Sequence, residues 1–277
     1  MKILFSVGPF SIHFFGAMIA VGILIGYFVA LKEAKRKGLD EEILANLVLY
    51  TILSGIIGAR LGYIAFYDPL YYLANPKEIF FINSGGLSIH GGIIGGVLTG
   101  LLYAKKKSLQ IWKTADAIVP ALILGQAIGR IGCDVFGVPM SEPFFWGIKI
   151  NNSILHPAQV YEFTLDYILF GYLWLRRMNI KYDGQLFVNY LLFFPVIRSL
   201  VELFRDNPTV WGFLSVSHLL SIALFASGLI LRQYLIKHQS LEIKVEEPIS
   251  MKKITQIVIL VFLSIISSLV IFYLVQG

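Results

Sequence analysis

The sequence predicts an all-α, polytopic integral membrane protein, and its composition and its long apolar segments carry that prediction. Of the 277 residues, 57% are hydrophobic and only 14% are charged, and the mean hydropathy is +0.74. Soluble domains carry about 25% charged residues, so an ordinary soluble enzyme is excluded. A disordered chain is excluded as well, because it would need low hydrophobicity and high net charge.

Eight segments are apolar enough and long enough to cross a bilayer, which takes about 20 residues. They cover approximately residues 10–31, 44–66, 88–104, 115–137, 159–175, 184–204, 215–236 and 254–275. The first segment is too long to be the apolar region of a cleavable signal peptide. We therefore expect a membrane-embedded domain of seven helices in residues 1–237, a polar cytoplasmic linker at 238–253, and an additional C-terminal transmembrane helix at 254–277.

The basic residues predict the orientation of these spans. The segments after the first, third, fifth and seventh spans hold most of the 23 Lys and Arg residues. The opposite side holds only Lys2, Lys77, Lys149 and Arg205. Because basic loops stay in the cytoplasm, we expect the N-terminus and the end of the eighth span to lie outside. The formal charge of +6 follows from these loops, and we expect no nucleic-acid partner.

Ionisable residues inside the apolar segments gather at one predicted depth, the outer half of the membrane. They are Arg60, Arg130, Arg198, His90, Glu162 and Glu202. A central Arg costs roughly 2.5–3.5 kcal/mol on insertion scales, so such residues usually face a polar cavity and mark a functional pathway. Because the guanidinium group is the preferred partner of phosphate, the cluster predicts an outer-leaflet anion site suited to a phospholipid.

Structural ion pairing is the alternative interpretation of the same charges. It would join Arg198 to Glu202, which lies four residues along the same helix face. It would also join Arg130 to Asp134 and Arg60 to Glu162. The glycines that border these charges have helix packing as their plain interpretation, because small residues let helix backbones approach closely in lipid.

His90 is the candidate proton acceptor. It lies in the run Ser88-Ile89-His90-Gly91-Gly92, at the start of the third span. Imidazole has an unperturbed pKa of about 6.5 and takes a proton at neutral pH. A purely structural role for this histidine is the alternative. The single cysteine, Cys133, excludes an internal disulfide and a multi-cysteine metal site, and we expect no metal and no cofactor.

Six short motifs follow one another along about residues 4–236. The opening Gly8-Pro9-Phe10-Ser11-Ile12 comes first along the chain. The later motifs are Gly58-Ala59-Arg60-Leu61-Gly62-Tyr63, Gly86-Leu87-Ser88-Ile89-His90-Gly91-Gly92, Gly129-Arg130-Ile131-Gly132, His156-Pro157-Ala158-Gln159-Val160-Tyr161-Glu162, and Arg198 with Glu202 and Arg205. In this order they resemble the motifs of the prolipoprotein diacylglyceryl transferase family, and six ordered blocks are a far more specific signal than one histidine-diglycine.

The resemblance implies a transferase-like domain in residues 1–237, located in the bacterial cytoplasmic (inner) membrane. It implies transfer of diacylglyceryl from phosphatidylglycerol to the lipobox cysteine thiol of a prolipoprotein signal peptide, forming a thioether, with no cofactor. It assigns catalysis to His90, Arg130 and Arg198. It assigns substrate binding, or orientation of the arginines, to Arg60, Gln159, Tyr161, Glu162, Glu202, Gly91 and Gly92.

The chain also departs from the family pattern. Cys133-Asp134-Val135-Phe136 follows the arginine motif in place of the usual asparagine-containing run, and Phe15 and Phe194 replace tyrosines. Each replacement loses a hydroxyl that could hydrogen-bond lipid or peptide. A diverged member that binds lipid or lipoprotein with altered activity is therefore the second hypothesis. A transporter or channel is the third, but it would place polar residues at several depths or contain broken helices in paired halves.

Overall fold

The computed structural model describes residues 2–8, 10–81, 85–239 and 249–276. The chain divides into two compact units. The first unit comprises Met1–Phe5, Ile12–Ala30 and Ala115–Gly277, and the second comprises Ser6–Ser11 and Leu31–Thr114. Most of the predicted linker at 238–253 lies outside the described residues, since 240–248 are not among them.

Each of the eight predicted spans corresponds to a long helix in the described part of the chain. These helices are α1 (Phe14–Arg36), α2 (Glu41–Tyr67), α4 (Ile89–Lys106), α5 (Ile111–Ile131), α6 (Ala158–Arg176), α7 (Gln185–Glu202), α8 (Val216–His238) and α9 (Met251–Gln276). Six of them, α1, α2, α5, α7, α8 and α9, are long and apolar enough to cross a membrane. Glycines and terminal lysines in α4, and Glu162 and Asp166 in α6, lower the hydropathy of the other two.

The two long connections that follow α2 and α5 contain short elements. The first holds α3 (Pro69–Ala74) and the 3-10 helix η1 (Pro76–Phe80), and the second holds the antiparallel strands β3 (Ile148–Ile150) and β4 (Ser153–Leu155). Two further hairpins pair β1 (Ile3–Val7) with β2 (Phe10–His13) and β5 (Thr209–Trp211) with β6 (Leu214–Ser215). These small hairpins were not predicted from the sequence, and they leave the fold all-α in character.

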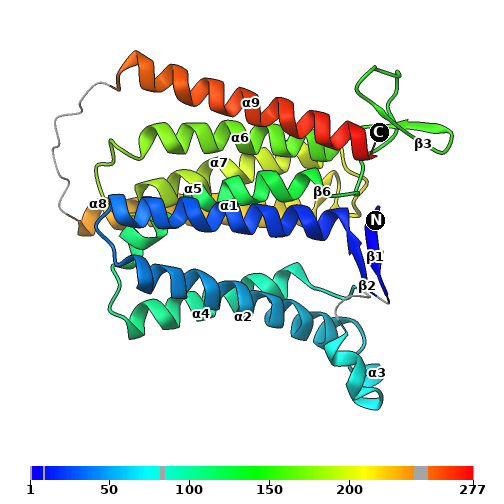
Figure 1. The fold of residues 1–277 in the computed structure, drawn as a ribbon, viewed down its shortest axis with the longest axis horizontal. Helices are drawn as coiled ribbons and strands as arrows, with labels where there is room; N and C mark the ends of the chain where they lie inside the picture. Colours follow the sequence, from blue (N-terminus) through cyan, green and yellow to red (C-terminus); the bar gives the residue numbers. More distant parts are fainter. Residues whose placement is uncertain (1, 9, 82–84, 240–248, 277) are drawn as a thin grey trace. The chain divides into compact units, whose positions relative to one another are not determined.

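The first unit is a bundle in which α6 is central, and α9 runs alongside it (Figure 1). Phe163 on α6 and Phe272 on α9 are fully buried, and their ring centroids lie 6.2 Å apart. A Cβ placed on Gly22 of α1 would come 2.7 Å from the carbonyl oxygen of Gly125 on α5. Because real Cβ atoms do not approach backbone so closely, only glycine lets α1 and α5 pack at this distance.

The N-terminus of α7 is capped from another helix. Asp116, in the second turn of α5, is fully buried, and its two carboxylate oxygens accept hydrogen bonds from the backbone N–H groups of Gly184 (2.9 Å) and Phe187 (3.0 Å). The first N–H groups of a helix have no partner within the helix. Asp116 therefore supplies acceptors that the Gly184 turn itself lacks, since Gly184 has no side-chain cap.

The second unit pairs α2 with α4 through glycines on both helices (Figure 1). A Cβ placed on Gly62 would come 2.8 Å from the Cα of Gly91, and one on Gly95 would come 2.6 Å from the carbonyl oxygen of Ser54. The plain interpretation of these glycines, helix packing, is therefore confirmed for this pair of helices.

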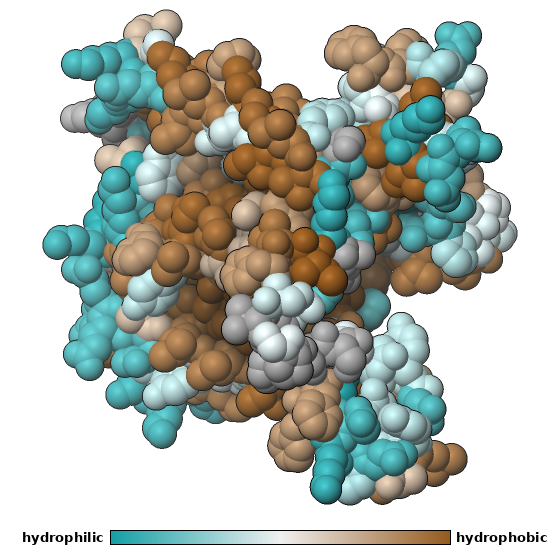
Figure 2. Space-filling model, turned by 45° about the vertical axis from the view of Figure 1, so that its right-hand side comes forward, coloured by the Kyte–Doolittle hydropathy of each residue, from teal (hydrophilic) through white to brown (hydrophobic). Residues whose placement is uncertain are grey.

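Large apolar side chains remain exposed along the helices, and they cover much of the face seen in Figure 2. Examples are Leu24 on α1 (56% exposed), Ile57 on α2 (60%), Leu102 on α4 (60%) and Leu263 on α9 (59%). Soluble monomers rarely expose contiguous apolar surface on this scale. Together with the apolar helices, this surface shows a multi-pass membrane protein.

Candidate functional site

Three arginines and two glutamates meet where α5 ends, α6 begins and α7 ends. The Nη2 of Arg130 lies 3.0 Å from Oε1 of Glu162, and the Nη2 of Arg198 lies 3.0 Å from Oε2 of Glu202. The Nη1 of Arg198 is 3.7 Å from Oε2 of Glu162. Glu162 and Glu202 are buried at 1% and 4% exposure. The predicted pair of Arg198 with Glu202 is thus confirmed, while Arg130 pairs with Glu162, which the sequence analysis had matched to Arg60.

Arg205 is the third arginine of this cluster, and the sequence analysis did not select it as a site residue. Its Nη1 lies 3.8 Å from Oε2 of Glu162 and its Nε lies 3.8 Å from Oε2 of Glu202. Burial and the nearby charge of Arg198 lower the pKa of the Arg205 guanidinium below its ordinary value. The seven-residue spacing from Arg198 was the available signal, but Arg205 follows the last apolar turn and was counted as a loop residue.

Several guanidinium N–H groups of the cluster have no hydrogen-bond acceptor among the described residues. Nη1 of Arg198 and both Nε and Nη1 of Arg205 are buried without a hydrogen-bond partner among the described residues. Their separations from the carboxylates, 3.7–3.8 Å, are too long for hydrogen bonds. Of the three arginines in the cluster, Arg130 is the most accessible, with 28% of its side chain exposed. Unfilled guanidinium donors facing one another are a site for an anion with several oxygens.

A second layer of hydrogen bonds fixes Glu202. Its Oε1 accepts from the hydroxyl of Ser215 at 2.6 Å and from the side-chain amide of Asn207 at 2.8 Å. Ser215 is also the N-cap of α8, where the ring Nδ1 of His218 accepts from the Ser215 backbone N–H at 3.2 Å. His218 therefore closes a capping box at Ser215, the residue that also donates to Glu202.

Gln159 and Tyr161 support the same end of the bundle. The side-chain amide of Gln159, which is fully buried, donates to the Cys133 carbonyl at 3.0 Å. The Tyr161 hydroxyl accepts from Nε1 of Trp146 at 3.1 Å and lies 3.0 Å from Nδ1 of His156. Both residues thus contact the segments next to the arginine cluster, Gln159 at Cys133 and Tyr161 at Trp146 and His156.

Asp166 lies one helical turn beyond Glu162 on α6. It is 1% exposed, and neither carboxylate oxygen has a hydrogen-bond partner among the described residues. Asp166 was not predicted as a site residue, because it lies outside the motifs of the sequence. Phe194, which the sequence analysis noted as a departure from the family pattern, stacks on Tyr190 with ring centroids 5.0 Å apart.

Arg60 belongs to the second unit, where its guanidinium group is fully used. Its five N–H groups donate to the backbone carbonyls of Ile79 (3.0 Å), Gly85 (3.0 Å), Gly86 (2.9 Å), Phe81 (3.0 Å) and Glu78. A guanidinium group has five donors, so none remains for a carboxylate. Arg60 therefore holds together the loop that leads into α4.

His90 lies in the first turn of α4, in the same unit as Arg60. Ser88 is the N-cap, and its hydroxyl accepts from the Gly91 backbone N–H at 3.5 Å. The His90 side chain is exposed. Gly91 is buried against Gly58 and Gly62, and a Cβ on Gly92 would come 3.3 Å from the Gly55 carbonyl oxygen. The two glycines thus set the packing of the helix that presents His90.

The described residues contain no group of three or more His, Cys, Asp and Glu that could hold a metal ion. The side chains described above offer guanidinium, carboxylate, imidazole and amide groups. Such a set can bind an anion, stabilise a growing negative charge and accept a proton.

Comparison with known proteins gives a consistent result. Residues 2–234 match the family model described as prolipoprotein diacylglyceryl transferase. A protein of Finegoldia magna is 36% identical over 251 residues, which cover 89% of this chain and 99% of that protein. Proteins of Halalkalibacterium halodurans and Clostridioides difficile are each 35% identical, covering 84% and 85% of this chain and 86% and 96% of their own. All three are named phosphatidylglycerol–prolipoprotein diacylglyceryl transferase.

Proposed function

The chain belongs to the prolipoprotein diacylglyceryl transferase family, and we propose that it transfers the diacylglyceryl group of phosphatidylglycerol to the lipobox cysteine of a prolipoprotein. The relatives' names supply both substrates. The single observation that carries the proposal in this chain is the arginine cluster with its unfilled donors. A phosphodiester headgroup is an anion of the chemistry that such a cluster binds.

The proposed step exchanges one bond for another. The cysteine sulfur of the client attacks the terminal glycerol carbon of the diacylglyceryl group, so a C–S bond forms while the C–O bond to phosphate breaks. The phosphate leaves with the glycerol headgroup, and the thiol proton goes to a base. The thiolate is the nucleophile, and a thiol pKa near 8.5 means that the base increases its concentration at neutral pH.

The arginines act on the leaving group. A phosphodiester carries one negative charge, and the departing phosphomonoester gains a second, so charge grows on the phosphate as the C–O bond breaks. Donors that are already oriented stabilise such growing charge without reorganising. We assign this to Arg130 and Arg198, with Glu162 and Glu202 holding their guanidinium groups in place. Gln159 and Tyr161 position the surrounding backbone.

For the proton we propose His90. It is exposed at the start of α4, and a neutral imidazole has a ring nitrogen that can accept a proton. Arg60, Gly91 and Gly92 support this role by fixing the loop and the helix that carry the imidazole. The client supplies the reacting thiol, so Cys133, which is buried, takes no part as nucleophile.

We also propose that the chain lies in the bacterial cytoplasmic (inner) membrane with its N-terminus outside. The basic loops support this orientation, and it puts the arginine ends of α5 and α7 in the outer leaflet. Residues 1–237 would form the transferase domain, joined by a cytoplasmic linker at 238–253 to the last helix.

The experiment is a reconstituted lipidation assay. Purified protein in vesicles receives phosphatidylglycerol with labelled acyl chains and a lipobox peptide. We expect a thioether-linked diacylglyceryl peptide, and no product from the same peptide with serine in place of cysteine. Arg130→Ala and His90→Ala should each abolish product, while Lys105→Ala, at the other end of α4, should not. Lipid binding without product would favour the diverged binder instead.

A further inference from the structure

The last helix, α9, lies outside the residues that match the family model, 2–234, yet it is built into the core of the first unit. Its Ser268 hydroxyl lies 2.9 Å from the hydroxyl of Tyr167 on α6. A Cβ placed on Gly171 of α6 would come 2.8 Å from the side chain of Val261. Close packing along its length means that α9 sits in a fixed register against the helix that carries Glu162.

The C-terminal turn of α9 contacts the end of α5. The side-chain amide of Gln276 donates to the carbonyls of Ile131 (3.2 Å) and Cys133 (3.1 Å). The last carbonyls of a helix have no partner within the helix, and these two follow Arg130 by one and three residues. Gln276 therefore supplies donors to the turn that sets where the Arg130 side chain begins.

The preceding turn of α9 contacts a second support of the site. The Tyr273 hydroxyl donates to the Trp146 carbonyl at 2.5 Å. The indole of that same residue donates to the hydroxyl of Tyr161, the neighbour of Glu162. Two side chains of α9 are thus linked to both partners of the ion pair between Arg130 and Glu162. Gln276 bonds carbonyls just after Arg130, and Tyr273 is connected to Glu162 through Trp146 and Tyr161.

From these contacts we infer that α9 is a positioning element of the transferase site, acting through Gln276 on Arg130 and through Tyr273 on the start of α6. This inference rests on the proposed transferase function. Neither residue touches substrate in this assignment. A displacement of about 1 Å at reacting groups can cost about 100-fold in rate, so losing these anchors should lower kcat.

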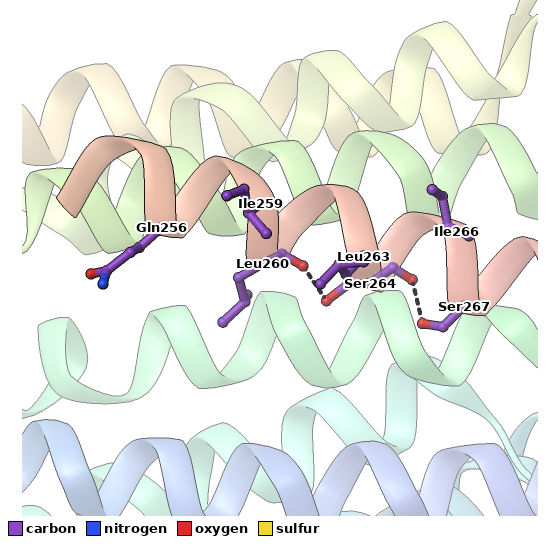
Figure 3. A pocket seen from close by; sticks show the side chains of 7 residues that line it. All are labelled: Gln256, Ile259, Leu260, Leu263, Ser264, Ile266 and Ser267. Carbon is purple, nitrogen blue, oxygen red and sulfur yellow. Dashed lines mark hydrogen bonds between the residues drawn. The ribbon is translucent and has the colours of Figure 1, made fainter. Parts of the chain in front are cut away.

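The opposite face of α9 offers matched controls. Figure 3 shows the side chains along a shallow groove on this helix, lined by Gln256, Ile259, Leu260, Leu263, Ser264, Ile266 and Ser267. Its serine hydroxyls donate to carbonyls of α9 itself, Ser264 to Leu260 (2.9 Å) and Ser267 to Ser264 (3.0 Å). Ser267→Ala and Leu263→Ala therefore alter the same helix without touching the anchors.

The experiment compares Gln276→Ala, Tyr273→Phe and their double variant with these two controls in the full-length protein. We expect kcat for lipidation to fall about tenfold or more in the double variant, with KM for phosphatidylglycerol within about twofold. Gln276→Glu, which keeps the length but replaces the donor with a carboxylate, should behave like Gln276→Ala.

A second readout does not depend on lipidation. Cys133 is buried at 4% exposure, and its carbonyl is one of the two that Gln276 holds. Alkylation of the Cys133 thiol at 25 °C should speed up severalfold in the double variant and remain unchanged in the controls. If the wild-type protein makes no product, the transferase proposal fails, while the alkylation rates still decide whether α9 holds the end of α5.

Two results would overturn the inference. One is a double variant with wild-type kcat and wild-type alkylation. The other is a lower melting temperature in detergent with an unchanged kcat per folded molecule, because that is what a helix that merely stabilises the bundle would give.

Discussion

Arg130 and Glu162 form a 3.0 Å ion pair between the last turn of α5 and the second turn of α6. Glu162 also stands between two further arginines, Arg198 and Arg205, at 3.7 and 3.8 Å. One buried carboxylate therefore organises three guanidinium groups contributed by three parts of the chain. This arrangement keeps the arginines close together without filling all their donors, which is what an anion site requires.

Replacement of Glu162 with Gln should destabilise the protein and stop lipidation. The substitution keeps the shape of the side chain but removes the negative charge that lies within 3.8 Å of three guanidinium groups, and breaking a buried ion pair costs about 3–5 kcal/mol. We expect a lower melting temperature in detergent and product formation reduced by at least about 100-fold. Glu42→Gln, which removes an exposed acid at the start of α2, should change neither. A wild-type melting temperature in Glu162→Gln would contradict the central role of this carboxylate.

Replacement of Ser215 with Ala should loosen Glu202. It removes the 2.6 Å hydrogen bond to the carboxylate and the N-cap of α8 together, at a cost of about 1–3 kcal/mol. Ser215→Thr keeps the hydroxyl and should restore both stability and lipidation. Ser227→Ala removes a hydroxyl that bonds only to its own helix and serves as control. Equal loss in Ser215→Ala and Ser215→Thr would mean that the hydroxyl is not the important group.

The sequence predicted the helices well because lipid imposes a strong and simple rule. Every backbone polar group in the bilayer must be paired within the segment, so a long apolar run such as 254–275 forms a helix whatever its neighbours. The pair of Arg198 with Glu202 was predictable once the helix was predicted, because residues four apart on a helix lie close together.

Partners between segments were harder to predict. The hydrophobic periodicity of the sequence does not reveal that Glu162 forms an ion pair with Arg130. It also does not reveal that all five N–H groups of Arg60 donate to backbone carbonyls of one loop. Those contacts depend on how the helices pack. The cap that Asp116 provides was not predicted for a similar reason, because Asp116 lies near the N-terminus of α5 and caps a different helix, α7. Even α9, predicted as a simple addition, contacts α5 and α6 through side chains whose partners lie more than 100 residues away.

Replacement of Gly58 with Ala should disrupt the pairing of α2 with α4. The added Cβ would come 3.1 Å from the Cα of Gly95 and closer still to the Gly91 carbonyl, and overpacking of this kind costs about 1–3 kcal/mol. Gly100→Ala is the matched control, because its Cβ would meet only Thr51 Oγ1 at 3.6 Å. We expect Gly58→Ala to aggregate at a lower temperature in detergent, and Gly100→Ala to match the wild type or exceed it. Similar curves for the two variants would show that backbone proximity does not constrain this pair.

The proposed orientation predicts which positions are accessible from outside the cell. Cys133 is buried, so single new cysteines report on topology. A maleimide that cannot cross membranes should label Phe145→Cys, at a side chain that is 95% exposed, in intact protoplasts. It should label Lys107→Cys and Lys252→Cys only after permeabilisation. Labelling of Lys252→Cys before permeabilisation would show that the eighth helix has the opposite orientation. Labelling of Lys107→Cys before permeabilisation would show the same for the first seven helices.

Replacement of Asp116 with Ala should destabilise α7 from its N-terminus. Two backbone N–H groups, those of Gly184 and Phe187, lose their acceptors in a buried setting, which costs about 1–3 kcal/mol. The single native thiol measures this directly, because Cys133 reacts with a fluorogenic maleimide only when the bundle opens. We expect the thermal midpoint of this reaction to fall in Asp116→Ala and to fall less in Asp116→Asn, whose amide oxygen still accepts one of the two bonds. Leu122→Ala, at an exposed position of the same helix, should retain the wild-type midpoint. An Asp116→Ala midpoint equal to that of Leu122→Ala would show that α7 needs no cap from α5.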